Sequence, residues 1–173
     1  MRLIVLSTAI AVAAGVLIAQ GGGQQRGGGK GPAAPKLYTS AAEVQALIAK
    51  AKEQNAAKST ATIAQNLLRL DPYNVSMEYR SSIGPAAIHD TEAEMFYVID
   101  GTATMVTGGK LVGETRNGVN LTGSAIEGGD TRNIGKGDFI VVPEKTAHWF
   151  SQINGTLVLM SFHLTRPVPA AAK

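Results

Sequence analysis

The sequence predicts a mainly β protein, a single antiparallel sandwich or barrel with one short N-terminal amphipathic helix. Short apolar segments of strand length, separated by glycine, follow one another through the second half of the chain. Only one segment has the apolar spacing of a helix. No second helical period lies between the strands, as a parallel α/β sheet would require.

Composition limits the chain to one domain. Its 173 residues, 45% hydrophobic and 17% charged, are enough for a single hydrophobic core. The chain has no cysteine, so stability must come from buried apolar surface rather than disulfides. The net charge of +3 is small and the basic residues of the β region are scattered, so we expect no nucleic-acid partner.

Residues 1–19 have the pattern of a secretory signal peptide. Arg2 precedes a long apolar run that ends in small residues, and no acidic residue interrupts it. We expect cleavage near Ala19 and a periplasmic or secreted protein. The alternative is an uncleaved leader that anchors the protein in a membrane, because the run approaches the length of a membrane span.

Residues 20–37 are predicted to be a flexible tether, because GGGQQRGGGKGPAAPK contains no large apolar residue. Residues 38–57 form the helical segment. Ser40 and Glu43 have the spacing of a capping box, which predicts a helix over roughly 41–55. One face of this helix should pack against the outside of the β domain, the face of Val44, Leu47 and Ile48.

Residues 58–168 are predicted to form the β domain. ATIAQNLLRL and VSMEYRSS flank the turn DPYN and should pair. We interpret Gly101 as a turn glycine that ends a strand, and residues 108–129 as a pair of hairpins. The remaining predicted strands are EMFYVIDG, TATMVTGG, VNLTGSAI, DFIVVP, AHWFSQI and TLVLMSFHL.

Two segments contain histidine at informative spacing. His89 lies five residues before Glu94, and Gly101 follows Glu94 by seven. In GDFIVVPEKTAHWFSQ, a glycine and Pro143 precede His148. Together the two segments resemble the two motifs of the cupin superfamily, G(X)5HXH(X)3,4E(X)6G and G(X)5PXG(X)2H(X)3N.

The resemblance is partial. With the four-residue spacer, His89 falls on the second histidine of the first motif and Ala87 replaces the first. Ser81 stands at the leading glycine of that motif. In the second motif Lys145 replaces a glycine and Gln152 replaces the asparagine.

The resemblance implies a jelly-roll β-barrel in which His89, Glu94 and His148 bind a divalent metal, with a vacancy at Ala87. The metal would be Fe, Mn, Zn or Ni, which two imidazoles and a carboxylate can hold with positions left open. His163, on a late strand, could fill the vacancy, or it could be a strand histidine satisfied by hydrogen bonds. Members of this family commonly form homodimers.

Period-two alternation predicts a small-molecule pocket around these residues. Phe150 and Gln152 share a face with His148, and Phe96 shares one with Glu94. The sequence does not decide the roles of the more polar residues nearby. Asp90 and Glu92 could orient a ligand imidazole, Trp149 is expected to pack, and an anionic ligand could be held by Arg69, Glu78 and Arg80 if their strands turn them inward.

Three kinds of function remain open from the sequence. The first is an exported metal-dependent enzyme, of the isomerase, oxygenase or lyase type, acting on a small organic molecule. The second is a non-catalytic periplasmic barrel that binds a small ligand, with or without metal. The third is a metal-free barrel with a structural role in a homodimer. The fold alone does not choose among them.

Overall fold

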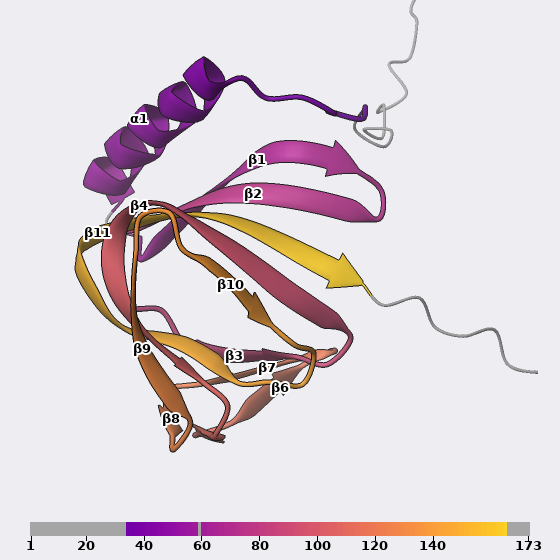
Figure 1. Ribbon diagram of the computed structural model, residues 1–173, viewed down its shortest axis with the longest axis vertical. Coiled ribbons are helices and arrows are strands. Elements are labelled where there is room, and N and C mark those ends of the chain that lie inside the picture. Colours follow the sequence, from indigo (N-terminus) through magenta and orange to yellow (C-terminus); the bar gives the residue numbers. More distant parts are fainter. Residues whose placement is uncertain (1–33, 59, 166–173) are drawn as a thin grey trace, which may run out of the picture. The chain divides into compact units, whose positions relative to one another are not determined.

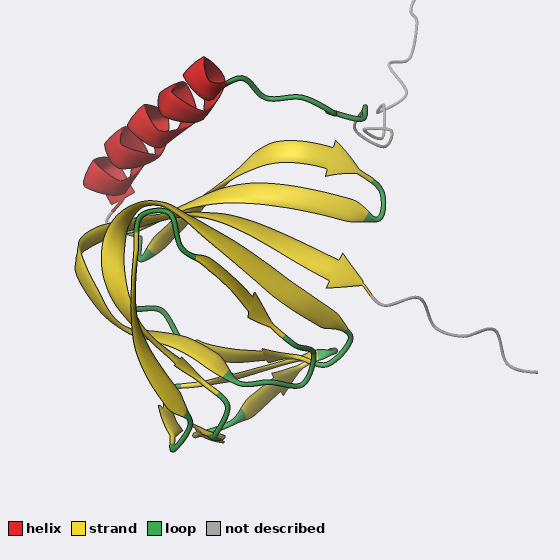
Figure 2. Ribbon diagram, viewed as in Figure 1, coloured by secondary structure: helices red, strands yellow, loops and turns green. Residues whose placement is uncertain are grey.

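The computed structural model describes residues 34–58 and 60–165, which form two layers of antiparallel strands with one helix on the outside (Figures 1 and 2). The predicted signal peptide and most of the predicted tether lie outside the described residues. Within the described part of the chain, no helix has the length and apolar character needed to cross a membrane. The end of the predicted tether is joined to the fold, because the backbone of Lys36 pairs with that of Arg69.

The one helix among the described residues, α1 (Ala41–Lys58), begins with the predicted capping box. The Ser40 N–H donates to Glu43 Oε2 at 2.8 Å, and the Glu43 N–H donates to Ser40 Oγ at 3.2 Å. The helix runs to Lys58 and is therefore slightly longer than predicted. It packs on the outer face of the sheet, and the contact is made by Ala51 with Val44, Leu47 and Ile48.

Eleven strands follow within residues 60–165, all paired antiparallel. The first two pair as predicted. The strands are β1 (Thr62–Leu70), β2 (Tyr73–Arg80), β3 (Ala86–His89), β4 (Glu92–Thr107), β5 (Lys110–Val112), β6 (Thr115–Asn117), β7 (Asn120–Gly123), β8 (Ala125–Glu127), β9 (Asp130–Gly135), β10 (Phe139–Val142) and β11 (His148–Thr165).

The prediction of separate short strands is wrong at two places, because β4 and β11 are each one long strand. Gly101 lies inside β4 with φ of 88° and does not end it. A Cβ at Gly101 would lie 2.0 Å from the carbonyl oxygen of Thr156 on β11. The glycine therefore permits two backbones to approach closely where both strands bend.

Two strands were not predicted. β3 has the sequence AAIH, and β9 has the sequence DTRNIG. Both segments are short and lack clear apolar alternation. They form strands because neighbouring strands pair with them. β3 pairs with β7, and β9 pairs with the second half of β4. The predicted hairpin region instead contains β6 paired with β7 and a separate sheet of β5 and β8.

The long strands β4 and β11 each run through both layers (Figure 1). The α1 layer, which carries the helix, has the order β1, β2, residues 157–165 of β11, residues 92–101 of β4, and β10. The β3 layer has the order β6, β7, β3, residues 148–153 of β11, residues 102–107 of β4, and β9. This arrangement confirms the predicted antiparallel jelly-roll architecture.

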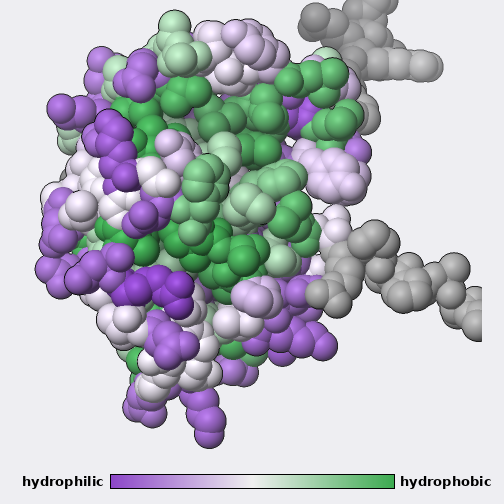
Figure 3. All heavy atoms as spheres, in the orientation of Figure 1, coloured by the Kyte–Doolittle hydropathy of each residue, from purple (hydrophilic) through white to green (hydrophobic). Residues whose placement is uncertain are grey.

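Two apolar clusters stabilise the layers. One lies between them and includes Phe96, Met105, Phe150 and Leu159. The other lies between α1 and the outer face of the α1 layer. Apolar side chains also remain exposed on the edge strand β10, where Phe139 is 71% and Val141 is 59% exposed. Figure 3 shows hydrophobic residues gathered over the middle of the face that it presents.

Candidate metal centre

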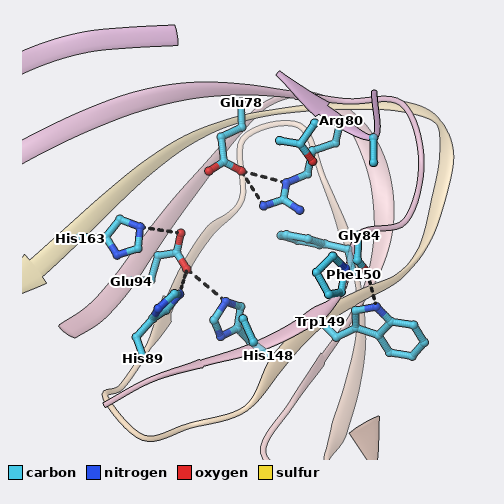
Figure 4. Close-up of a pocket in the computed structure, with 13 residues that line it drawn as sticks. Glu78, Arg80, Gly84, His89, Glu94, His148, Trp149, Phe150 and His163 are labelled. Carbon is cyan, nitrogen blue, oxygen red and sulfur yellow. Dashed lines mark hydrogen bonds and ion pairs between the residues drawn. The ribbon is translucent and has the colours of Figure 1, made fainter. Parts of the chain in front are cut away.

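All three histidines of the chain and Glu94 converge between the two layers (Figure 4). His89 ends β3 and His148 begins β11, so both come from the β3 layer. Glu94 lies near the start of β4 and His163 near the end of β11, both in the α1 layer. The cluster therefore draws on four strand ends from two regions of the sequence, residues 89–94 and residues 148–163.

Glu94 is at the centre of the cluster. Its Oε2 lies 3.4 Å from His89 Nε2 and 3.1 Å from His148 Nε2, and its Oε1 lies 3.4 Å from His163 Nε2. Ser161 Oγ also donates to Oε1 at 2.7 Å. Glu94 is only 4% exposed, so these polar partners compensate for the loss of water around a buried carboxylate.

Strand register explains the convergence. Glu94 on β4 stands opposite His163 on β11, so the two side chains share the inner face. His148 stands opposite Ala87 on β3, and alternation places His89 on the same face as Ala87. Strand pairing together with local alternation therefore brings these side chains to the inner face.

The turn before β11 also positions His89. Lys145, which replaces a motif glycine, has φ of 60°, in the left-handed region that glycine adopts easily. Its N–H donates to the carbonyl oxygen of His89 at 2.8 Å. The turn that precedes His148 is thus hydrogen-bonded to the strand that presents His89.

Further polar groups lie behind the imidazoles. Asn120 Oδ1 lies 2.9 Å from His89 Nδ1, so a hydrogen bond from Nδ1–H directs Nε2 toward Glu94, where Nε2 donates when protonated and can bind a metal when deprotonated. Glu92 Oε2 lies 3.1 Å from His163 Nδ1, without the alignment of a hydrogen bond. His148 Nδ1 is buried and has no hydrogen-bond partner among the described residues. Asp90 instead bonds to Arg116 at 2.6 Å.

The cluster shifts two pKa values. Burial of Glu94 disfavours its charged form, but hydrogen bonds from His148 and His89 outweigh burial and hold the pKa of Glu94 well below its usual value. The contact with Glu94 raises the pKa of His89, and burial only partly opposes this. Both shifts favour an ionised carboxylate beside a protonated imidazole when no metal is bound.

The donor set fits a divalent transition metal. One ligand atom from each of His89, Glu94 and His163 can be chosen so that all three atoms lie within 4.8 Å of one another. His148 Nε2 is in contact with the same carboxylate. Imidazole nitrogens with one carboxylate oxygen suit iron, zinc, nickel or manganese.

A cavity of about 450 Å³ opens beside the cluster. Phe150 lines it, while Phe96 lies behind in the core, 5.5 Å from Phe150 and 6.0 Å from His148 between ring centroids. Gln152 does not reach the cavity, which corrects the prediction. A β-bulge between Phe150 and Gln152 breaks the alternation, and Gln152 is exposed with its amide bonded to Asn154.

Other walls come from residues that the sequence left undecided. Glu78 and Arg80 line the cavity, whereas Arg69 is not among its lining residues. Trp149 lines the cavity and its Nε1–H donates to the Gly84 carbonyl at 3.0 Å. Asn120 was not predicted as a site residue, because it is the first residue of the short strand β7 and has no distinctive spacing in the sequence.

The comparison with known protein families agrees with the fold. The family model described as Cupin matches residues 49–169. No curated protein matches the chain. Similar solved structures include the Cnp3 cupin domain of Schizosaccharomyces pombe, with 11% identity, a TM-score of 0.45 and coverage of 62% of this chain and 66% of that chain. KdgF from Halomonas sp. has 15% identity, a TM-score of 0.43 and coverage of 61% and 81%. FeII HppE has 14% identity, a TM-score of 0.45 and coverage of 60% and 50%.

Proposed function

Because this chain belongs to the cupin family, we propose that it binds a divalent metal between its two layers and acts there on a small organic molecule. The observation that supports this proposal is the contact of three imidazoles with the buried carboxylate of Glu94. The adjoining cavity of about 450 Å³ has a volume suited to a small ligand.

The proposed ligands are His89, Glu94 and His148, with His163 as a fourth ligand. His163 takes the part of the missing first-motif histidine, whose position holds Ala87. The methyl group of Ala87 lines the cavity, whereas His163 Nε2 lies 3.4 Å from Glu94. The fourth imidazole is therefore supplied by β11 in the α1 layer instead of β3.

The metal would act as a Lewis acid that polarises a bound oxygen or activates water. The chain's own residues prepare the site for it. Asn120 holds His89 with Nε2 inward, and Ser161 holds one oxygen of Glu94. Phe150 and Phe96 supply apolar surface beside the ligands and so limit the access of water.

The reaction type and the cellular location are parts of the same proposal. We favour a metal-dependent enzyme of the isomerase, oxygenase or lyase type. The pattern of residues 1–19 supports export to the periplasm or the outside of the cell. The apolar side chains exposed on β10 support a homodimer.

The alternative is a non-catalytic barrel that binds a small ligand, with or without metal. Ala87 at the first-motif histidine favours this alternative if His163 does not bind the metal, since a site with three ligands binds metal less tightly than a site with four. Turnover of a substrate by the metal-loaded protein would exclude this alternative. Stabilisation by a ligand without any turnover would support it.

The first test is metal content. We expect the mature protein, purified without chelator, to contain about one metal per chain by elemental mass spectrometry. His148→Ala and Glu94→Ala should each lose most of this metal while remaining folded. Gln152→Ala is the matched control, because Gln152 is exposed on β11 outside the cavity. Full metal content in both ligand variants would contradict the proposal.

A further inference from the structure

A second polar group faces the cavity opposite the histidine cluster (Figure 4). Glu78 and Arg80 lie two residues apart on β2 and therefore share its inner face. Arg80 Nε donates to Glu78 Oε2 at 2.8 Å, and Arg80 Nη2 lies 2.7 Å from the same oxygen. Their side chains are 13% and 18% exposed, so this ion pair is largely removed from water.

The guanidinium is held in place from the other layer. Arg80 Cζ lies 4.9 Å from the ring centroid of Phe150, within the range of a cation–π contact. A Cβ placed on Gly84 would lie 3.7 Å from Arg80 Nη1, so this nitrogen faces the loop at the cavity wall. Arg80 therefore has a fixed orientation across the cavity.

The pair retains hydrogen-bonding capacity. Both contacts use Oε2 of Glu78, which leaves Oε1 as an acceptor and Arg80 Nη1 as a donor. Stability does not explain the pair, because apolar residues of similar volume usually stabilise a protein as well as a buried ion pair does. A neutral pair that offers one acceptor and one donor complements a hydroxyl group, which both donates and accepts.

The net charge of the groups around the cavity limits the class of ligand further. Arg80 and Glu78 neutralise each other. A divalent metal bound by Glu94 and neutral imidazoles has one positive charge that its own ligands leave uncompensated. Glu92 lies 3.1 Å from His163 Nδ1, but its side chain is 32% exposed, so water screens part of its charge. A ligand with a single negative charge, placed toward the metal, would balance the cavity.

We propose that the Glu78–Arg80 pair selects a small hydroxylated monocarboxylate. Its carboxylate lies toward the histidine cluster and a hydroxyl group bonds to Glu78 and Arg80. This inference rests on the proposed function, because the metal supplies the charge that the carboxylate balances.

The test compares glycerate with lactate on the metal-loaded mature protein by calorimetry. Both acids have a carboxylate and a 2-hydroxyl group, and only glycerate has a hydroxyl group at its far end. A hydrogen bond to a charged group predicts that glycerate binds about ten- to one-hundredfold more tightly. The double variant Glu78→Met with Arg80→Met, which stays neutral, should reduce this preference to near unity. Arg80→Lys, which keeps the charge but loses the planar donor geometry, should weaken it.

The control is a second double variant, Asp100→Asn with Lys136→Met, which removes an exposed ion pair away from the cavity and should keep the preference. Failure of the wild-type protein to take up metal would overturn the proposed function and this inference with it. Metal uptake with equal binding of the two acids, with no binding of either, or with an unchanged preference in the double variant would overturn this inference alone.

Discussion

At the residue scale, Glu94 and His89 couple the cluster to pH. A carboxyl pKa that folding lowers contributes stability above its ordinary value of 4.5, and this is lost as pH falls through the folded pKa. A histidine pKa that folding raises contributes stability below its ordinary value of 6.5, and this is lost as pH rises through the folded pKa. The metal-free cluster is therefore most stabilising between these two limits.

We expect the melting temperature of the metal-free protein, measured with chelator present, to fall as pH rises above 6.5. Part of this fall comes from the loss of the proton on His89. Bound metal should remove this component, because it replaces the proton on Nε2. His89→Asn is the control and should not show it. An equal fall in wild-type protein and His89→Asn would contradict the assignment to His89.

Asn120 gives a second prediction at this scale. Asn120→Ala should lower metal affinity about ten- to one-hundredfold, because it frees the ring of His89 to rotate and to change tautomer. Competition with a chelator of known affinity would measure the change. Asn117→Ala, an exposed change in the same hairpin, should have little effect. Similar losses in both variants would assign the effect to the hairpin instead of the hydrogen bond.

The predictability of the site differs from residue to residue. His89, Glu94 and His148 could be proposed from sequence because motif spacing along the chain specifies them. Glu78 and Arg80 could not be assigned to the cavity, because alternation gives two faces without saying which one is inward. Asn120 reaches His89 only through the pairing of β3 with β7, a contact between distant segments. Gln152 was misplaced because a bulge is not visible in alternation.

At the scale of elements, the long strands depend on close backbone approach at Gly101. Gly101→Ala should destabilise the protein by about 2–4 kcal/mol, because a Cβ would overlap the Thr156 carbonyl and the backbone is in the left-handed region. Gly118→Ala is the matched control. It has φ of 62° but nothing within 4 Å of the added Cβ, so it should cost only about 1–2 kcal/mol.

Chemical denaturation would measure both free energies of unfolding. An equal decrease in the free energy of unfolding in the two variants would mean that the left-handed backbone conformation alone, without the contact to Thr156, explains why glycine is needed at position 101.

The elements show what local sequence can and cannot specify. The start of α1 was predictable because the Ser40 and Glu43 capping box acts within one turn. The β1–β2 pair was predictable because a short turn joins two apolar segments. The continuity of β4 through Gly101 was not predictable. A glycine at this place in the sequence usually marks the end of a strand, and only the approach of the distant strand β11 shows that β4 continues. β9 is a strand only because β4 supplies its partner.

At the scale of the whole molecule, the exposed apolar side chains of β10 bear on assembly. We expect sedimentation of the wild-type protein to report a homodimer, and Phe139→Lys with Val141→Lys to give a monomer, because charge on both residues would oppose burial at an interface. Val119→Lys is the control, since Val119 is 53% exposed on a different strand connection. A dimer that persists in the double variant would place the interface elsewhere.

The passage of β4 and β11 through both layers has a consequence for how the molecule opens. Two sheets that share continuous strands cannot swing apart about a loop, so separating them requires breaking backbone hydrogen bonds in both. The two layers should therefore belong to one cooperative unit, with amide hydrogens in both exchanging through the same global opening. The metal-ligand atoms of the two layers are therefore held at a nearly fixed separation even without metal. Folding, rather than metal binding, then accounts for most of the conformational entropy lost in ordering the site.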